Sequence, residues 1–208
     1  MELAAHLCGR RVNDLLENNQ EAKNFLSTLR PMGFHRVQIN ATAVNGVDVS
    51  NLSGNVKTLA DAIGDHPELE FILQKNEETK PLWEGLLQLE SFGGGQGKLP
   101  ENVVMLVDES KGTGVLASSW PSPPEEYDIG YAGGIGPVNV KTVLEDIMNV
   151  ATGRNVWIDM ESSLRSKVKS NDASGGEIEK DVFDLGKCFQ CIEVVCELGL
   201  FDHPSYLK

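Results

Sequence analysis

The chain has 208 residues, with 18 Lys and Arg against 31 Asp and Glu, and its formal net charge is −13. Nucleic acids and anionic membranes need a basic surface, so this charge disfavours both kinds of partner. No apolar run approaches the roughly 18 to 20 residues of a membrane span. The first residues are too polar for a signal peptide, and four cysteines make no disulfide framework, so we expect a cytoplasmic protein.

Six short apolar segments predict β-strands. Most of them are apolar almost throughout instead of alternating with polar residues, which is typical of parallel strands buried on both faces. The predicted strands are Leu3–Cys8, Arg36–Asn40, Leu69–Gln74, Val103–Val107, Ile129–Ala132 and Val156–Met160.

The segments between these strands carry helical patterns. Apolar residues recur at helical spacing over residues 11–29, and Pro81 and Pro137 mark first helical turns. A last helix is expected over residues 185–198. The alternation of strands and helices predicts an α/β fold with a parallel sheet, which residues 1–208 form as a single domain.

Three further segments are predicted to be irregular. Residues 91–97 and 166–180 are polar and rich in glycine, so we expect surface loops there. The sequence WPSPP at 120–124 favours a stiff loop or a lid over the mouth of the fold.

Polar and glycine residues follow the last three predicted strands, at the ends where parallel α/β folds place their sites. Glycines let a ligand approach the backbone, and a helix that starts nearby directs N–H groups at an anion. The alternatives are a tight strand-to-helix turn for the glycines and a helix cap for the carboxylate. The residues in question are Asp108, Gly112-Thr113-Gly114, Gly133-Gly134 and Ser162-Ser163.

Three stretches of this region resemble a known family. VMLVDESKGTG, IGYAGGIGP and WIDMESSLR, in this order and at these spacings, look like the last three strands and loops of phosphoribosylanthranilate isomerase. That family has an LLD strand end with a GTG-type loop, an AGGL-P-x-NV turn and a DxSSG phosphate loop. Residues 132–140 are close to the second of these motifs, and residues 36–40 resemble the family's fourth strand.

The resemblance implies a (β/α)8 barrel of the TIM type and a role like that of the family in tryptophan biosynthesis. The reaction would be an Amadori rearrangement, in which an acid opens the sugar ring and a base removes a proton from the adjacent carbon. Asp108 falls on the family's general acid, and burial would have to raise its pKa for this work near neutrality. The implied phosphate-binding residues are Gly112, Gly114, Gly133, Gly134, Ser162 and Ser163.

The chain also departs from the family pattern. Counted back from the matched strands, residues 3–8 correspond to the third strand, so the first two strands have no counterpart. The family's catalytic cysteine lies in Lys-x-Cys-Gly on strand one, whereas His6-Leu7-Cys8-Gly9 stands here on the third. Cys8 is a candidate thiolate base at the mouth, and the alternative is a buried thiol at the strand end. Ser163-Leu164 and Arg165 replace a glycine and an acidic residue of the phosphate loop.

Six strands do not close a barrel that needs eight, so the strands at 3–8 and 156–160 would leave exposed edges. We therefore expect a partner chain over the edges, such as a second copy in a homo-oligomer, or helices that block them, or a truncated barrel.

Two functions follow as hypotheses. The first is a phosphoribosylanthranilate isomerase-like protein that binds a phosphorylated sugar and catalyses an Amadori-type aldose–ketose isomerisation. The alternative is a non-catalytic phosphosugar-binding or scaffold protein, and another phosphosugar lyase or epimerase is a third possibility. No cofactor or metal is expected. Residues 93–99 lack the first glycine and the Ser or Thr of a P-loop, and Cys188, Cys191 and Cys196, with His203 beyond them, suit a helix core better than zinc.

Overall fold

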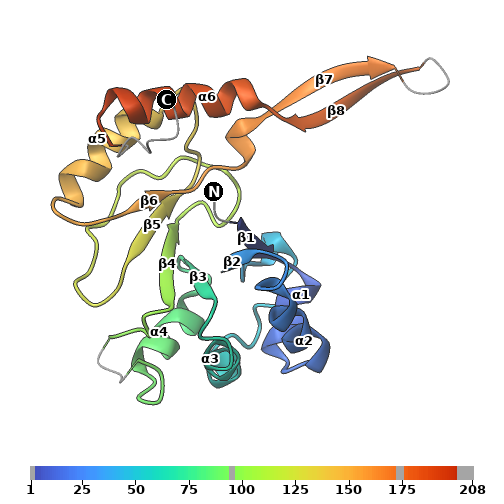
Figure 1. Ribbon diagram of the computed structural model, residues 1–208, viewed down its shortest axis with the longest axis vertical. Helices are drawn as coiled ribbons and strands as arrows, with labels where there is room; N and C mark the ends of the chain where they lie inside the picture. Colours follow the sequence, from blue (N-terminus) through green and yellow to red (C-terminus); the bar gives the residue numbers. More distant parts are fainter. Residues whose placement is uncertain (1–2, 94–96, 172–175, 201–208) are drawn as a thin grey trace.

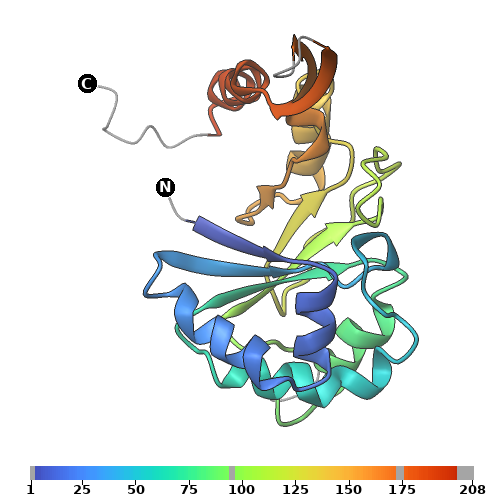
Figure 2. The same ribbon diagram turned by 90° about the vertical axis from the view of Figure 1, so that its right-hand side faces the viewer.

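The computed structural model describes residues 3–93, 97–171 and 176–200 and has an α/β architecture. All six predicted strands form, and they lie in one parallel sheet in chain order, so each strand pairs with the next. Figure 2 shows this sheet curled into a half-barrel. The strands are β1 (Leu3–Leu7), β2 (Phe34–Ile39), β3 (Glu70–Lys75), β4 (Val103–Asp108), β5 (Ile129–Ala132) and β6 (Trp157–Ile158).

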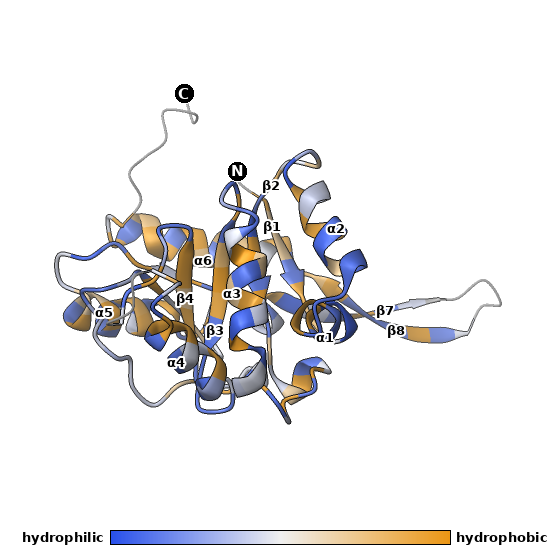
Figure 3. Ribbon diagram, turned by 90° about the horizontal axis from the view of Figure 1, so that it is seen from below, coloured by the Kyte–Doolittle hydropathy of each residue, from blue (hydrophilic) through white to orange (hydrophobic). Residues whose placement is uncertain are grey.

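Helices cover the convex outer face of the sheet (Figure 1). Their apolar sides meet outward-facing side chains such as Phe71, Met105 and Tyr131 in one continuous hydrophobic core. Figure 3 shows β4 as mostly hydrophobic and much of α2 as hydrophilic, as expected for a buried strand and a surface helix. The helices of the described residues are α1 (Arg10–Leu16), α2 (Gln20–Leu29), α3 (Val56–Gly64), α4 (Lys80–Gln88), α5 (Val140–Val150) and α6 (Leu185–Glu197).

The concave inner face holds a second, smaller apolar cluster. Ile72, Val104 and Leu106 are buried there together with Ala132, and Trp157 packs against them. Gly130 lies opposite Trp157 in the sheet register, and a Cβ on this glycine would clash with the indole ring. Because Gly130 has no side chain, the Trp157 ring has room to pack against this inner apolar cluster.

The helical pattern predicted over residues 11–29 is confirmed, but it is divided between two helices, α1 and α2. Asn18 has a φ of 63° and separates α1 from α2. The Asn19 side chain then caps α2 by accepting a hydrogen bond from the Glu21 N–H at 2.8 Å. Asparagine tolerates the left-handed region and caps helices well, so two polar residues break a stretch whose apolar spacing continues across them.

The connection between β4 and β5 forms no helix and no lid. Trp120 is buried and meets Tyr131 edge to face, with their ring centroids 5.7 Å apart. The Tyr131 hydroxyl donates to the Pro121 carbonyl at 2.7 Å, and Arg154 donates to the Pro124 carbonyl at 2.7 Å. Burial raises the pKa of Tyr131 to about 12. The segment expected over the mouth instead packs on the hydrophobic core behind β5.

The polar segment at 166–180, predicted as a loop, lies in a β-hairpin within the described residues. Strands β7 (Arg165–Asn171) and β8 (Glu177–Phe183) pair antiparallel and project from the body in Figure 1. Ion pairs join Lys167 to Glu179 at 3.0 Å and Lys169 to Glu177 at 2.8 Å. Such pairs between strands stabilise a two-stranded ribbon. The polar composition of this segment therefore does not indicate a loop. Within the other loop prediction, residues 94–96 lie outside the described residues.

No helix among the described residues has the length and apolarity needed to cross a membrane. The strands β1 and β6 form the two edges of the sheet. That the whole chain is a single domain stays a prediction.

The contact between Gly130 and Trp157 predicts a large effect of a small substitution. Gly130→Ala places a methyl group in the indole ring and should lower the free energy of unfolding by about 1–3 kcal/mol, as overpacking does. Urea denaturation measures this change. The matched control is Gly64→Ala in α3, where an added Cβ meets nothing within 4 Å. Equal stability of the two variants would contradict the packing of Trp157 over Gly130.

Candidate functional site

A pocket of about 180 Å³ lies at the carboxyl ends of β4, β5 and β6. Loops that are distant in the chain converge there because parallel strands end at the same rim of the sheet. Seven of the eight site residues predicted from the sequence line this pocket, and Cys8 does not. The seven are Asp108, Gly112, Gly114, Gly133, Gly134, Ser162 and Ser163.

Asp108 is the last residue of β4 and is buried. Its Oδ2 accepts hydrogen bonds from Gln74 Nε2 at 2.8 Å and from the Gly112 N–H at 2.9 Å. Its Oδ1 accepts one from the Ser110 hydroxyl at 2.5 Å. The carboxyl group thus holds the following loop against β3 while one face of the residue lines the pocket.

Glycines allow the three loops of the pocket to approach one another closely. Gly133 and Gly134 have φ values of 112° and 64°, which other residues rarely adopt. A Cβ on Gly134 would clash with the backbone of Leu116, and one on Gly136 would clash with Ser163. The Gly114 loop meets the serine loop in the same way, since a Cβ on Gly114 would lie 2.8 Å from Ser162 Oγ.

Asn139 closes the turn after β5. Its side chain accepts from the Gly136 N–H and donates to the Gly134 carbonyl, both at 2.9 Å. Helix α5 begins only at Val140, so the expectation that Pro137 opens the helix is wrong by one turn. The amide of Gly136 is therefore not available to a ligand, and the residues of the first turn of α5 do not line the pocket.

Three amide groups of this turn remain available. Within the described residues, the N–H groups of Gly133, Gly134 and Ile135 donate to no protein acceptor. All three residues line the pocket. The hydroxyl groups of Ser162 and Ser163, in a short 3₁₀ turn after β6, add further donors along the same wall.

Asp159 is a site residue that the sequence reasoning missed. It follows β6, its N–H donates to the Tyr131 carbonyl at 2.8 Å, and it lines the pocket. Burial is the main cause that raises its pKa, and the charges of Glu161 and Asp108 add to the increase. His6 and a hydrogen bond from Gln38 oppose it. The signal in the sequence was the same that identified Asp108: a carboxylate at the end of an apolar strand.

The side chains around the pocket are acidic. Asp108, Asp159 and Glu161 line it, and no Lys or Arg of the described chain does. The hydrogen-bond donors of the described pocket lining are therefore main-chain N–H groups and hydroxyls instead of basic side chains. None of the described residues form a group of three or more His, Cys, Asp or Glu that could hold a metal ion.

Cys8 lies apart from this pocket. Its thiol is exposed, so the expected buried thiol is wrong, and it is absent from the pocket lining that the base hypothesis requires. Cys8 Sγ accepts a hydrogen bond from Asn40 Nδ2 at 3.4 Å, and Asn40 Oδ1 accepts one from Gln38 Nε2 at 3.0 Å. Cys8 is thus bound to the Asn40 amide and does not line the pocket.

Comparisons with known proteins do not identify the chain. No protein-family model matches it, and no curated protein shows significant similarity to it. The chemistry of the pocket is therefore the basis for any statement about function.

The raised pKa of Asp159 predicts how stability changes with pH. Above its ordinary pKa of 3.8, this carboxyl ionises in the unfolded chain before it ionises in the folded protein. Unfolding therefore becomes easier as the pH rises from 3.8 through the raised pKa of the folded state. Asp159→Asn removes this effect, so the stability of the variant relative to the wild type should increase between pH 3 and pH 7.

Urea denaturation at both pH values measures this difference. Asp146→Asn, at an exposed position of α5, is the matched control. A relative stability of Asp159→Asn that falls with pH would contradict the burial of this carboxyl group.

Proposed function

We propose that this chain binds a phosphorylated sugar in the pocket at the ends of β4, β5 and β6. The observation that carries the proposal is the set of unused N–H groups of Gly133, Gly134 and Ile135 beside Ser162 and Ser163. Neighbouring backbone N–H groups and hydroxyls are suitable donors for the oxygens of a phosphate group.

The acidic side of the pocket supports a sugar as the other part of the ligand. Asp108, Asp159 and Glu161 repel a second anionic group, but their oxygens accept hydrogen bonds from hydroxyl groups. A ligand with a phosphate at one end and neutral hydroxyls at the other can bind both the donor groups and the carboxylates of the pocket. A free dianion can bind only the donor groups.

We also propose that the half-barrel belongs to the TIM type. Strands β2 and β6 are four positions apart in the sheet, and strands so related lie opposite each other in an eight-stranded barrel. Gln38 of β2 and His6 of β1 both act on the pKa of Asp159 after β6, which places the three residues near one another on the concave side. This proximity supports a curvature close to that of a complete barrel.

Isothermal titration calorimetry with ribose 5-phosphate tests the binding proposal. Ser162→Ala/Ser163→Ala should weaken binding about tenfold or more, because each lost hydroxyl removes a hydrogen bond to a charged group. Ser27→Ala, at an exposed position of α2, is the control and should bind as the wild type does. Ribose without phosphate should bind far more weakly.

Two results would refute the proposal. One is the absence of ribose 5-phosphate binding by the folded protein. The other is equal binding by the double serine variant and the wild type.

An isomerase activity is the second candidate, and the pairing of two acids in one pocket favours it. Asp108 accepts three hydrogen bonds, whereas burial raises the pKa of Asp159, so the two carboxyls differ in environment. Such differences separate acid and base roles. Phosphoribosylanthranilate isomerisation would be followed by the loss of the substrate's fluorescence.

If this candidate is correct, Asp108→Asn and Asp159→Asn should each lower kcat by about a hundredfold or more. Asp146→Asn should leave kcat unchanged. Cys8→Ser should also leave it unchanged, because Cys8 does not line the pocket. No turnover together with tight phosphosugar binding would favour the non-catalytic binding protein.

A further inference from the structure

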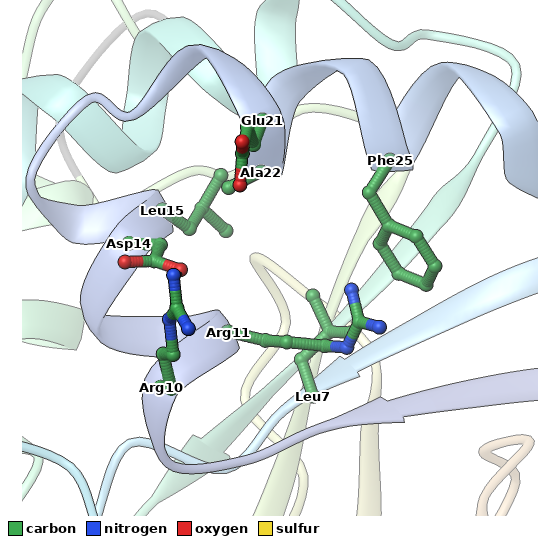
Figure 4. A pocket seen from close by; sticks show the side chains of 8 residues that line it. All are labelled: Leu7, Arg10, Arg11, Asp14, Leu15, Glu21, Ala22 and Phe25. Atoms are coloured by element: carbon green, nitrogen blue, oxygen red, sulfur yellow. The ribbon is translucent and has the colours of Figure 1, made fainter.

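A pocket of about 380 Å³ between β1, α1 and α2 lies outside the candidate site (Figure 4). Arg10 pairs there with Asp14 at 3.3 Å on the same helix. The Arg11 guanidinium lies 4.1 Å from the centroid of the Phe25 ring. Acidic and basic side chains both line this pocket, so its charge selects no class of ligand. Helix α6 carries a more specific group of side chains, because three of the four cysteines of the chain lie on it.

Cys188 and Cys191 are neighbours on α6. They lie three residues apart, and this spacing places two side chains on one face of a helix with their Cβ atoms about 5–6 Å apart. Cys191 belongs to the hydrophobic core, and the half-buried Cys188 packs against this core. Burial raises the pKa of Cys191, and the nearby Cys188 adds to the increase. The two thiols are therefore close together, and Cys188 is the one that a reagent from the solvent reaches first.

The spacing of these two cysteines suits a disulfide bond. Three residues along a helix separate Cα atoms by about 5 Å, which is within the range that a disulfide bridges. Their Cβ atoms must approach to about 3.8 Å, so the bond requires a shift of the first turns of α6. Cys196 lies five residues beyond Cys191, about 7.5 Å further along the helix axis, and is too distant to form this bond.

The start of α6 is hydrogen-bonded to one wall of the candidate site. We call residues Ser162–Leu164 the serine turn, and two of them, Ser162 and Ser163, line the pocket. Asp184, the N-cap of α6, donates its N–H to the Leu164 carbonyl at 2.8 Å. The Asp184 carboxylate accepts a hydrogen bond from Ser166 Oγ at 2.7 Å. A shift of the first turns of α6 therefore reaches the serine turn through Asp184.

Cys188 itself takes part in this set of hydrogen bonds. Its thiol donates to the Asp184 carbonyl at 3.3 Å. The Lys187 N–H donates to the Asp184 carboxylate at 3.3 Å, and Lys187 Nζ donates to the Arg165 carbonyl directly after the serine turn. A cysteine in a disulfide has no S–H group, so oxidation of Cys188 removes one of the contacts that hold Asp184 in place.

We propose that Cys188 and Cys191 form a reversible disulfide that regulates the candidate site. The dithiol form holds Asp184 and the serine turn in the arrangement described above, and the disulfide form loosens the serine turn. The expected change in ligand affinity rests on the proposed phosphosugar function. The disulfide and its effect on the serine turn do not depend on that function.

A low-molecular-weight disulfide such as glutathione disulfide is the oxidant. The Cys188 thiolate attacks one of its sulfur atoms, a mixed disulfide forms and one glutathione thiolate leaves. The Cys191 thiolate then attacks the Cys188 sulfur, so the protein disulfide forms and the second glutathione leaves. The two thiol protons pass to the two glutathione thiolates. The two electrons of the protein dithiol thus reduce one glutathione disulfide to two glutathione molecules.

Mass spectrometry of the folded protein after treatment with glutathione disulfide and alkylation tests the disulfide. The tryptic peptide that begins at Cys188 should lose the mass of two hydrogen atoms, and its Cys196 should be alkylated. Cys191→Ala should stop at a glutathione adduct on Cys188, and Cys188→Ser should form no disulfide with Cys191. Cys196→Ser, at an exposed position of the same helix, is the matched control and should oxidise as the wild type does. Circular dichroism confirms that each variant is folded.

Hydrogen exchange and calorimetry test the effect on the site. Backbone amides of the serine turn should exchange faster in the oxidised wild type than in the reduced wild type. The affinity for ribose 5-phosphate should fall about fivefold or more, at the lower end of couplings between distinct sites, and dithiothreitol should restore it. Cys188→Ser should show neither response to glutathione disulfide, because its hydroxyl keeps a donor for Asp184 and cannot be oxidised to a disulfide.

Each contrary result has one meaning. A wild type that stays a dithiol under glutathione disulfide would overturn the proposal. Unchanged exchange at the serine turn in the protein that carries the disulfide, or equal affinity of the two forms, would overturn the regulation of the site and leave the proposed function standing. Absence of ribose 5-phosphate binding by the reduced protein would refute the proposed function, and the exchange of the serine turn would then decide the effect of the disulfide alone.

Discussion

A parallel sheet buries both faces only if something covers each of them, and this requirement shapes the whole molecule. Helices cover the convex face, but none of the described helices forms a layer on the concave side. There the sheet curls, and Ile72, Val104 and Leu106 are buried with Trp157 of the edge strand β6 packed against them. Gly130 permits this arrangement because it gives the indole its space. The same curl brings the loops after β4, β5 and β6 together.

The electrostatics of the pocket follow from this convergence. Asp108 ends β4 and Asp159 follows β6, and the curl places them close enough for the charge of Asp108 to raise the pKa of Asp159. Main-chain N–H groups at Gly133 and Gly134 lie on the same pocket wall and supply the opposite polarity. The pocket therefore offers both main-chain hydrogen-bond donors and carboxylate acceptors.

The strands and the position of the pocket could be predicted because each depends on local sequence. A run of apolar residues that ends in a polar one marks both a buried strand and its carboxyl end. The features that sequence missed depend on partners distant in the chain. The effect of Gln38 on the pKa of Asp159 depends on the curl of the sheet, and the packing of Trp120 on Tyr131 depends on the path of the loop between β4 and β5. The hairpin of β7 and β8 depends on charge pairs whose register no short window shows.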